Sequence, residues 1–481
     1  MASLLYPFGK EKIGNVNNAL HDLQIDTICK MVFVDKGKQN KILEILSNIC
    51  TDKETIEYRQ RVLSDMIFNR NIFYGLGKEA SNLNKCYSDY NATRSARAKL
   101  KIKNELEISE TTMMLKDYAM DIQKLINVYY NLGKVFETYG PSSNGLKELS
   151  SKVSKYINNS FFDKLQIIIN DILKQHSAYA FYTELDDKLM PINNKFVLCS
   201  GKYVPDKGGI FKRKDTNDIA KVEINTKVKE DFDRITIDSF NRIVVLLEDI
   251  FESLYDEISY FSDEYIFFEF ANAVYDTLGE RRIDCSFAKV SSNTKYKNAK
   301  DLYLCMKYIK EGYSYPIYGN DITIDHKQSL LVVGSNNTGK TVFLRTLGIN
   351  QIFFQNGLFI VADNSEIEIK ESITTIFSGE EKDTDVGGRF EKEVIEIKEI
   401  IDKVNDKSMV IINEIFQSTF AQDGKRALFD ILNYFSEINV TWIDVTHLIT
   451  ILDNRKNFVN NVKIYETSDS KNNFKIKEII Q

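Results

Sequence analysis

Proline and tryptophan are scarce in this sequence of 481 residues, which contains five prolines and one tryptophan. Proline breaks helices because it lacks a backbone N–H and clashes with the preceding turn. A chain of this length with so few prolines therefore favours long, uninterrupted helices. Its 43% apolar and 27% charged residues are ordinary for a globular protein and can supply more than one core. The length predicts roughly three domain-sized units.

The sequence also lacks the patterns that hold metals, disulfides or membranes. Its six cysteines form no CxxC pair, and its four histidines have no metal-ligand spacing. We therefore expect reduced thiols in a cytoplasmic protein. The N-terminal stretch MASLLYPFGKEKIGN has no apolar run long enough for a signal peptide, and no segment reaches transmembrane length. We expect no membrane partner.

An excess of basic residues is absent as well. The net charge is −6, so no basic field over the whole chain attracts nucleic acid. DNA binding would need a local basic patch or a clamp geometry. Lys212, Arg213 and Lys214 form one compact basic cluster, which fits either phosphate contacts or a solvated run of charge.

Two segments within the first three hundred residues have regular apolar spacing. Both alternate steps of three and four residues, which is the heptad seam of long helices that pack nearly parallel or antiparallel. The seams consist of Leu115, Tyr118, Ile122, Leu125, Tyr129, Leu132 and Phe136, and of Ile237, Phe240, Val244, Leu247, Phe251, Leu254, Ile258 and Phe261. Together they indicate an outgoing and a returning arm, although each alone also fits an ordinary bundle helix.

The sequence pattern changes twice along the chain. Residues 190–232 mix short apolar alternations with Gly-Gly and Asp-Lys turn signals, which predicts strands or a structured loop. From about residue 311, apolar strands alternate with helices, which implies a largely parallel sheet. We therefore predict a mainly helical region over residues 1–310, with residues 190–232 as an insert, and an α/β domain over residues 311–481.

The stretch GSNNTGKT matches the phosphate-loop pattern GxxxxGK[ST] without a gap. Its residues are all candidates for nucleotide binding: Gly334, Ser335, Asn336, Asn337, Thr338, Gly339, Lys340 and Thr341. An apolar strand precedes the loop and a helix follows it, so backbone N–H groups at a helix N-terminus can surround phosphates. Lys340 can reach the β- and γ-phosphates, and the Thr341 hydroxyl can ligate Mg²⁺. The loop predicts ATP or GTP binding, with a chance match as the alternative.

A second motif lies where the strand SMVIIN ends at Asn413 and Glu414 follows. A phosphate-loop sheet should contain such a strand with an acidic residue near the phosphates. Glu414 can act as general base toward the attacking water, and a strand-end surface acid is the alternative. Asn413 offers the metal a neutral oxygen where aspartate would bring a charge. Because Mg²⁺ often keeps several waters, an amide can still order them, with weaker attraction for the metal.

His447 follows the next apolar strand, VTWIDVT. In ABC-type ATPases a histidine in this place senses the γ-phosphate, and its titration near neutral pH lets it form hydrogen bonds in either protonation state. A purely structural histidine is the alternative.

Together these motifs resemble the MutS family of mismatch-repair ATPases. The stretch LLVVGSNNTGKTVFLRTLGINQIFFQNGLFIVA is similar to the family's phosphate loop and following helix, and Asn336 matches the asparagine of GPNMGGKST. INEIFQSTFAQDG resembles LDEIGRGTSTYDG, and VTWIDVTHLITIL resembles TLFATHYHELTEL, which places His447 on the family's switch histidine. YPIYGNDITI resembles the segment that supplies an adenine platform, so Ile317 or Tyr318 would contact the ring. Upstream, TDKETIEYRQRVLSDM resembles the DPEVIEYRQ stretch of the family's helical core domain.

The resemblance implies a fold, ligands and partners. It implies a long-helix core and lever region followed by an ABC-type P-loop ATPase domain that binds ATP with Mg²⁺. Glu414, His447 and Asn336 would be catalytic, and Thr341 and Asn413 would serve the metal. The chain would form a homodimer through ATP held between two ATPase domains, and its helical arms would enclose or grip DNA.

The sequence also departs from the family pattern. The mismatch-reading domain with its Phe-x-Glu wedge has no counterpart, and neither has a C-terminal Smr nuclease. The signature loop SGRSTF reads GGRFEK: Gly388 and Arg389 remain, while Phe390 and Glu391 replace the Ser-Thr that would meet the partner's γ-phosphate. Gln417 stands where arginine is usual. NEIF resembles a stand-alone branch of small bacterial MutS-related proteins.

Two functions follow from these features. The first is an ATP-binding, slowly hydrolysing MutS-like protein that dimerises and binds DNA in a structure-dependent or non-specific way, without reading mismatches. The second is an ATP-gated protein-interaction device with little hydrolysis and no nucleic-acid partner. The net charge of −6, the altered signature loop and Asn413 favour the second.

Overall fold

A computed structural model describes most of the chain. The described residues are 3–7, 12–103, 108–174, 179–185, 191–198, 226–377, 389–416, 421–447, 451–452, 458, 461–468 and 474–479. The basic cluster at residues 212–214 lies outside them, as do Gly388 and Gln417, and the side chains of Arg389 and Phe390 are not described. Among the described residues, no helix has both the length and the apolar character that a membrane span requires.

The chain forms two compact units. We call residues 1–73, 141–147 and 264–481 the sheet unit, and residues 74–140 and 148–263 the helical unit. The helices of the helical unit are α5 (Arg70–Lys103), α6 (Ile108–Tyr139), α7 (Asn144–Ile157), α8 (Ser160–Lys174) and α9 (Thr226–Gly279), and α5, α7 and α9 also contribute residues to the sheet unit. Strands β3 (Tyr179–Leu185) and β4 (Pro191–Leu198) form an antiparallel pair, of which β4 lies in the predicted insert.

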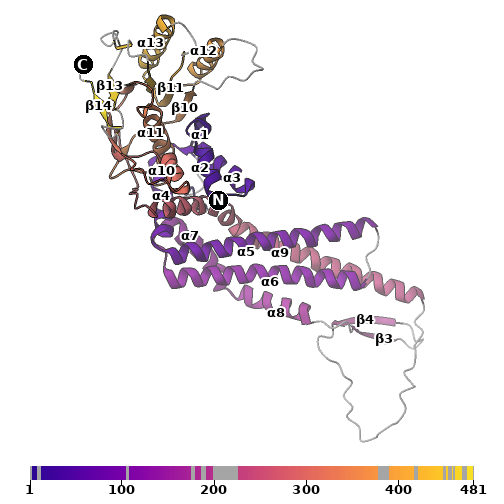
Figure 1. The fold of residues 1–481 in the computed structure, drawn as a ribbon. Coiled ribbons are helices and arrows are strands. Elements are labelled where there is room, and N and C mark those ends of the chain that lie inside the picture. The colour runs from indigo at the N-terminus through magenta and orange to yellow at the C-terminus, as the bar shows by residue number, and fades with distance from the viewer. Residues whose placement is uncertain are drawn as a thin grey trace. The chain divides into compact units, whose positions relative to one another are not determined.

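Both predicted apolar seams lie in the helical unit, one in α6 and one in α9. All residues of the two seams are buried except Ile237, which is half-buried. The Tyr118 hydroxyl donates to Glu248 Oε1 at 2.5 Å, and the Tyr129 hydroxyl donates to the Leu254 carbonyl at 2.8 Å. Because the contact advances in the same direction along both helices, α6 and α9 run parallel (Figure 1). The interpretation of the seams as an outgoing and a returning arm is therefore wrong.

The helix that runs antiparallel to α9 is α5, in whose sequence we predicted no apolar seam. Its Arg97 Nη1 donates to Glu248 Oε2 at 2.6 Å, and its Tyr90 hydroxyl donates to Glu252 Oε1 at 2.9 Å, so α5 runs antiparallel to α9. The buried face of α5 includes Glu79 and Arg97, whose charges interrupt an apolar heptad pattern. Those charges remain buried because they have partners on the neighbouring helices.

The sheet unit combines helices with two sheets. Its remaining helices are α1 (Ala19–Asp22), α2 (Ile25–Val32), α3 (Lys36–Ser47), α4 (Lys53–Phe68), α10 (Leu302–Lys310), α11 (Lys340–Gln355), α12 (Arg389–Ile401) and α13 (Ala421–Glu437). The strands of its larger sheet are β1 (Ile13–Asn17), β2 (Asn48–Cys50), β8 (Ser329–Val333), β10 (Ser372–Phe377), β11 (Ser408–Asn413), β12 (Thr441–Thr446), β13 (Val462–Thr467) and β14 (Ile476–Glu478). A smaller sheet contains β5 (Lys289–Val290), β6 (Thr294–Ala299), β7 (Asn320–Ile324) and β9 (Glu366–Ile367).

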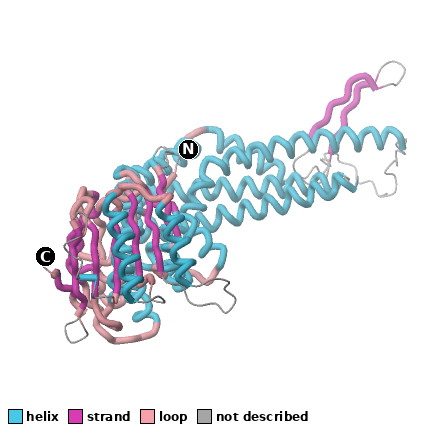
Figure 2. The backbone as a smooth tube through the Cα atoms, turned by 90° about the horizontal axis from the view of Figure 1, so that it is seen from above, coloured by secondary structure: helices cyan, strands magenta, loops and turns pink. Residues whose placement is uncertain are grey.

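The larger sheet is mostly parallel, as the alternation of strands and helices predicted. Its order is β14-β13-β8-β12-β11-β10-β1-β2, and every neighbouring pair from β13 to β1 is parallel, whereas both edge strands pair antiparallel. Figure 2 shows strands of the sheet unit side by side in magenta. The strands of the parallel part therefore all end at the same edge of the sheet, which we call the carboxyl edge.

Helices cover both faces of this sheet, and the alternation of side chains along β11 decides which residue faces which helix. Ile411 packs close to Gly348 of α11, where an added Cβ would lie 3.0 Å from its Cδ1 atom. Val410 and Ile412 point to the opposite face, into a core that includes residues of α12 and α13 together with Trp442. Asn413 therefore belongs to the face that α11 covers.

The compact units do not follow the predicted division at residue 310. Strand β1 pairs with β10, with Asn15 opposite Ser372, so the first 73 residues lie in the same unit as the C-terminal sheet. Such a pairing joins segments separated by more than 350 residues of sequence. A composition change along the chain therefore does not reveal it.

Candidate nucleotide-binding site

The predicted phosphate loop connects β8 to α11 at the carboxyl edge. Asn337 and Gly339 have φ values of 62° and 85°, in the left-handed region that lets the backbone curl tightly. Gly334 packs so closely on the Thr467 hydroxyl that a side chain has no room there. Gly339 caps α11 without any side-chain hydrogen bond, so the first N–H groups of the helix have no capping side chain and can bind an anion.

Lys340 opens α11 with its side chain folded into the loop. The residue is only 4% exposed, its Nζ donates to the Ser335 carbonyl at 2.9 Å, and it pairs with Glu414 Oε1 at 3.2 Å. A buried ammonium held by one carbonyl and one carboxylate can exchange these contacts for phosphate oxygens.

Thr341 and Asn413, the predicted metal residues, meet on the face that α11 covers. The Thr341 hydroxyl donates to Asn413 Oδ1 at 3.2 Å. The two side chains offer neutral oxygens only, which suits a metal that keeps much of its water. Among the described residues, no group of three or more His, Cys, Asp or Glu side chains could hold a metal ion by itself. The oxygens present fit a Mg²⁺ ion that arrives with phosphates better than a resident metal.

The backbone turns sharply just after β11 and thereby presents Glu414. Glu414 and Phe416 have φ values of 53° and 62°, which are uncommon for residues other than glycine. The Glu414 N–H donates to the Val445 carbonyl at 3.0 Å, and the Phe416 N–H donates to the buried Glu393 Oε2 at 2.9 Å. These contacts hold a turn that costs backbone strain, as is common where side chains are aimed at a ligand.

A buried acid lies beside Glu414 on the neighbouring strand. Asp444 is fully buried, in register with Ile412, and neither of its carboxylate oxygens has a hydrogen-bond partner in the structure as described. Burial, and secondly the charge of Glu414, raise the pKa of the Asp444 carboxyl well above its usual value. His447 lies on the same segment, two residues after Val445. Its Nδ1 atom is also buried without a hydrogen-bond partner.

A cavity of about 180 Å³ opens beside the loop within the sheet unit. Ile317 and Tyr318, the predicted ring contacts, line it next to Thr338 and Gly339 of the loop. The remaining lining residues come from β6, from α10 and the segment that follows it, from β7, from α11 and from the C-terminal region: Ala299, Asp301, Leu304, Tyr308, Pro316, Asn320, Val342, Phe343, Thr346, Thr467, Phe474 and Ile476. The largely apolar lining and the adjacent anion site suit the base and phosphates of one nucleotide.

Sequence reasoning missed the C-terminal contribution to this site. The Thr338 and Thr467 hydroxyls lie 2.5 Å apart, and Phe474, with a φ of 51°, reaches within 3.5 Å of the place a Cβ on Gly339 would occupy. These residues belong to no sequence motif. They lie near the loop only because β13 pairs with β8 and β14 pairs with β13. By contrast, Asp444 had a visible signal, since it is the one acid within the apolar strand TWIDVT.

The structure thus brings together Lys340, Glu414, Thr341 and Asn413, and it places Ile317 and Tyr318 at the neighbouring cavity. Asn336 is exposed on the loop.

Comparisons with known proteins find similarity to MutS proteins. The family model for MutS domain V matches residues 330–481. The DNA mismatch repair protein MutS of Petrotoga mobilis is 24% identical over 442 residues, which cover 85% of this chain and 52% of that protein. Endonuclease MutS2 of Streptococcus mutans is 32% identical over 130 residues, covering 27% of this chain and 17% of that protein. MutS protein homolog 4 of Homo sapiens is 26% identical over 136 residues, covering 28% of this chain and 14% of that protein.

The chain spans about half the length of the curated relatives that it matches along most of its own length, 52% and 53% for two MutS proteins. The family-model match covers the segment that carries the loop, Asn413, Glu414 and His447. The longer matches extend over the helices as well, at 24% and 22% identity. The chain is therefore similar to MutS proteins along most of its length, and its residues 330–481 match MutS domain V.

Proposed function

We propose that the chain binds ATP with Mg²⁺ at the carboxyl edge and hydrolyses it slowly. The observation that carries the proposal is the contact between Lys340 and Glu414 at 3.2 Å, beside a cavity lined by Ile317 and Tyr318. It joins a phosphate-binding cation, an acid and a site for a base in one place. The similarity to MutS proteins supports ATP binding and a role connected with DNA.

Each residue has a distinct task in this proposal. The loop N–H groups and Lys340 hold the phosphates, and Ile317 and Tyr318 pack against the base. In hydrolysis a water oxygen forms a bond to the γ-phosphorus while the bond to the bridging oxygen of ADP breaks, and the water proton passes to Glu414. Thr341 and Asn413 would hold Mg²⁺ or its waters, and the ion would supply positive charge beside the phosphates.

Slow turnover follows from the charges around the metal residues. Asn413 brings no negative charge, so the attraction for Mg²⁺ is weaker than an aspartate would provide. The Thr341 hydroxyl is hydrogen-bonded to Asn413 Oδ1 at 3.2 Å, and this contact must rearrange before either oxygen faces the metal.

Binding and hydrolysis can be tested separately. Isothermal titration calorimetry with ATP and Mg²⁺ should show one site per chain, and Lys340→Met should weaken it. Steady-state phosphate release should fall by about 10²–10⁴-fold in Glu414→Gln, the usual contribution of a general base, while ATP affinity is retained. Equal rates for the wild type and Glu414→Gln would remove Glu414 from the mechanism.

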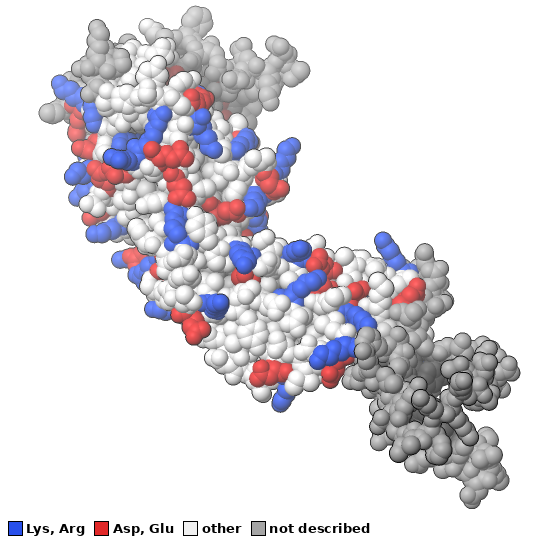
Figure 3. Space-filling model, turned by 60° about the horizontal axis from the view of Figure 1, so that its bottom comes forward, with Lys and Arg blue, Asp and Glu red and all other residues white. Residues whose placement is uncertain are grey.

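We further propose that ATP joins two copies of the chain and that the dimer binds DNA through its backbone, in a structure-dependent or non-specific way. The DNA mismatch repair name of one relative and the endonuclease name of another support a DNA-related role. On the face shown in Figure 3, basic and acidic side chains of the described residues are interspersed, which favours a few phosphate contacts over a broad basic surface.

Gel-shift series over salt, with duplex and branched DNA, test this second proposal, since phosphate contacts are strongest at low salt. Retention that weakens steeply with salt is expected, and mass measurement in solution with and without ATP and Mg²⁺ should show a nucleotide-dependent dimer. Absence of DNA retention at the lowest salt, combined with an ATP-dependent mass change, would instead favour the ATP-gated protein-interaction device. The net charge of −6, the altered signature loop and Asn413 are the features that favour that alternative.

A further inference from the structure

The cavity beside the phosphate loop has two helical walls joined by one buried ion pair. The wall from α10 contains Asp301, at its N-cap, with Leu304 and Tyr308, and the wall from α11 contains three residues of its first two turns, Val342, Phe343 and Thr346. The lining residues of the two helices are far apart in sequence. Their spacing therefore depends on contacts between the helices.

Asp301 is a buried residue that caps the N-terminus of α10 with its side chain. The residue is 1% exposed, and its Oδ1 accepts the Tyr303 N–H at 2.9 Å and the Leu304 N–H at 3.3 Å. This cap fixes the first turn of α10, the turn that carries Leu304 into the cavity wall.

Arg345 of α11 engages the other oxygen of the same carboxylate. Its Nε donates to Asp301 Oδ2 at 2.7 Å, and its Nη2 donates to the same oxygen. The guanidinium carbon also lies 4.5 Å from the centre of the Tyr303 ring, so the cation contacts α10 by both charge and stacking. The Arg345 side chain is only 12% exposed, and solvent screens this pair little.

We propose that the Asp301–Arg345 pair positions the α10 wall for the nucleobase and so sets the affinity for the base, separately from the phosphates. The inference rests on the proposed ATP site and adds residues that no motif includes. Arg345 follows the loop lysine by five residues on α11, on the side of the helix that meets α10. The pair therefore joins α10 to α11, and neither of its side chains belongs to the phosphate loop.

The test compares ATP with ribose 5-triphosphate, which has the same sugar and phosphates but no base. In the wild type, calorimetry should show tighter binding of ATP. In Arg345→Met and in Asp301→Asn, ATP affinity should fall about tenfold or more, toward that of the base-free ligand, whose own affinity stays unchanged. Arg345→Lys keeps one charged hydrogen bond and should lose less.

Controls separate positioning from folding. Burial raises the pKa of the Asp301 carboxyl and the Arg345 charge opposes this rise, so without Arg345 the carboxyl can keep a proton and still cap α10. Breaking a buried pair from one side is destabilising, and the double variant Asp301→Asn/Arg345→Met should recover stability without recovering ATP affinity. Glu371→Gln removes the exposed pair with Lys407, whose side chains are 45% and 61% exposed, and should change neither affinity.

Three results would overturn the inference: equal wild-type affinity for both ligands, unchanged ATP affinity in folded variants, or an equal loss for both ligands. The last would mean that the pair supports the loop as a whole. Failure of the wild type to bind either ligand would instead refute the proposed ATP site itself, so the two failures are distinguishable.

Discussion

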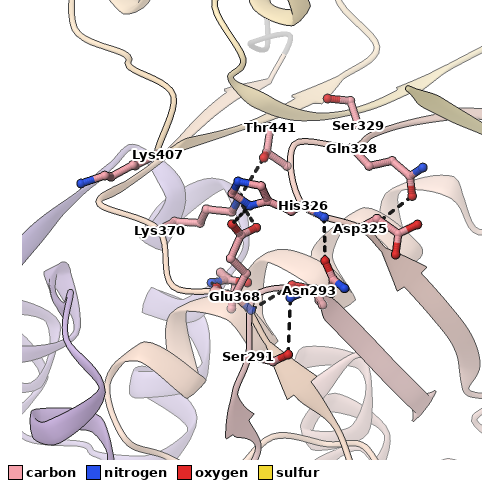
Figure 4. A network of polar contacts seen from close by, with 12 residues as sticks. Ser291, Asn293, Asp325, His326, Gln328, Ser329, Glu368, Lys370, Lys407 and Thr441 are labelled. Atoms are coloured by element: carbon pink, nitrogen blue, oxygen red, sulfur yellow. Dashed lines mark hydrogen bonds and ion pairs between the residues drawn. The ribbon is translucent and has the colours of Figure 1, made fainter. Parts of the chain in front are cut away.

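The two ends of the parallel sheet carry similar polar residues but differ in how completely the hydrogen-bonding atoms of these residues are paired. At the amino ends of its strands, Lys370 is 4% exposed, and its Nζ donates to Glu368 Oε2 at 2.6 Å and to the Thr441 hydroxyl at 2.9 Å (Figure 4). The other Glu368 oxygen lies 2.6 Å from Nδ1 of His326. Each charge in this network has a partner.

At the carboxyl edge the polar groups are less completely paired. Asp444 and the Nδ1 atom of His447 are buried without hydrogen-bond partners in the described structure. Buried polar atoms are normally satisfied, and exceptions concentrate where a ligand or a catalytic step uses them. We therefore expect the amino ends of this sheet to serve stability and its carboxyl edge to serve the proposed binding and hydrolysis of ATP.

Two lysines make this comparison testable, because Lys340 and Lys370 are each 4% exposed. Lys340→Met should weaken ATP binding about 100-fold or more, since a charged contact to phosphate in a desolvated site is lost. Its partner Glu414 is 23% exposed and keeps water, so stability should change little. Calorimetry measures the affinity, and fluorescence of Trp442, the only tryptophan, follows unfolding of the sheet unit. A loss of stability as large as the loss of binding would erase the distinction between the two ends.

Lys370→Met should have the reverse effect. The substitution removes the Lys370 ammonium, which contacts both Glu368 and the Thr441 hydroxyl. The Glu368 side chain, which is 16% exposed, then loses its lysine partner. Removing one partner of a buried ion pair costs about 3–5 kcal/mol. Urea unfolding followed by Trp442 fluorescence should show this loss, while the folded variant binds ATP as the wild type does. Weakened ATP binding by the folded variant would show that the amino ends communicate with the site.

Glu264 extends the comparison to an acid that is buried but hydrogen-bonded. It accepts the Ser3 hydroxyl and the Leu4 N–H, each at 2.5 Å, yet burial raises its pKa to about 7. The folded state thus keeps a proton that the unfolded state releases, and stability falls as pH rises from about 4.5 to about 7. Above that window the penalty is complete, about 3 kcal/mol for a shift of this size. Glu264→Gln should remove it.

Unfolding of the wild type and Glu264→Gln at pH 5 and pH 8 measures this effect. The variant should gain on the wild type as pH rises. An advantage of the same size at both pH values would show that Glu264 does not titrate in this window.

The sequence predicted those parts of the fold and of the candidate site whose residues lie close together along the chain. The loop at residues 334–341 and the neighbours Asn413 and Glu414 form short contiguous motifs, and the parallel sheet follows from alternating strands and helices. Asp301 and Phe474 join the cavity only through contacts with distant segments, and the charged, buried face of α5 gave no apolar period. Sequence patterns report local spacing well, and they do not report which distant polar groups meet.

Asp444 offers the finest test of the comparison, because it is the buried acid without hydrogen bonds. Since burial raises its pKa, the folded state holds its proton to higher pH than the unfolded state does, and stability declines as pH rises above the ordinary aspartate range. Asp444→Asn keeps the shape and removes the titration, so it should stabilise the sheet unit by about 1–3 kcal/mol at pH 8, the usual cost of an unsatisfied buried group, and by less at pH 5. Trp442, two residues away on β12, reports the unfolding. A destabilised variant at pH 8 would mean that the carboxylate has a partner in the working protein and that the carboxyl edge is as fully paired as the amino ends.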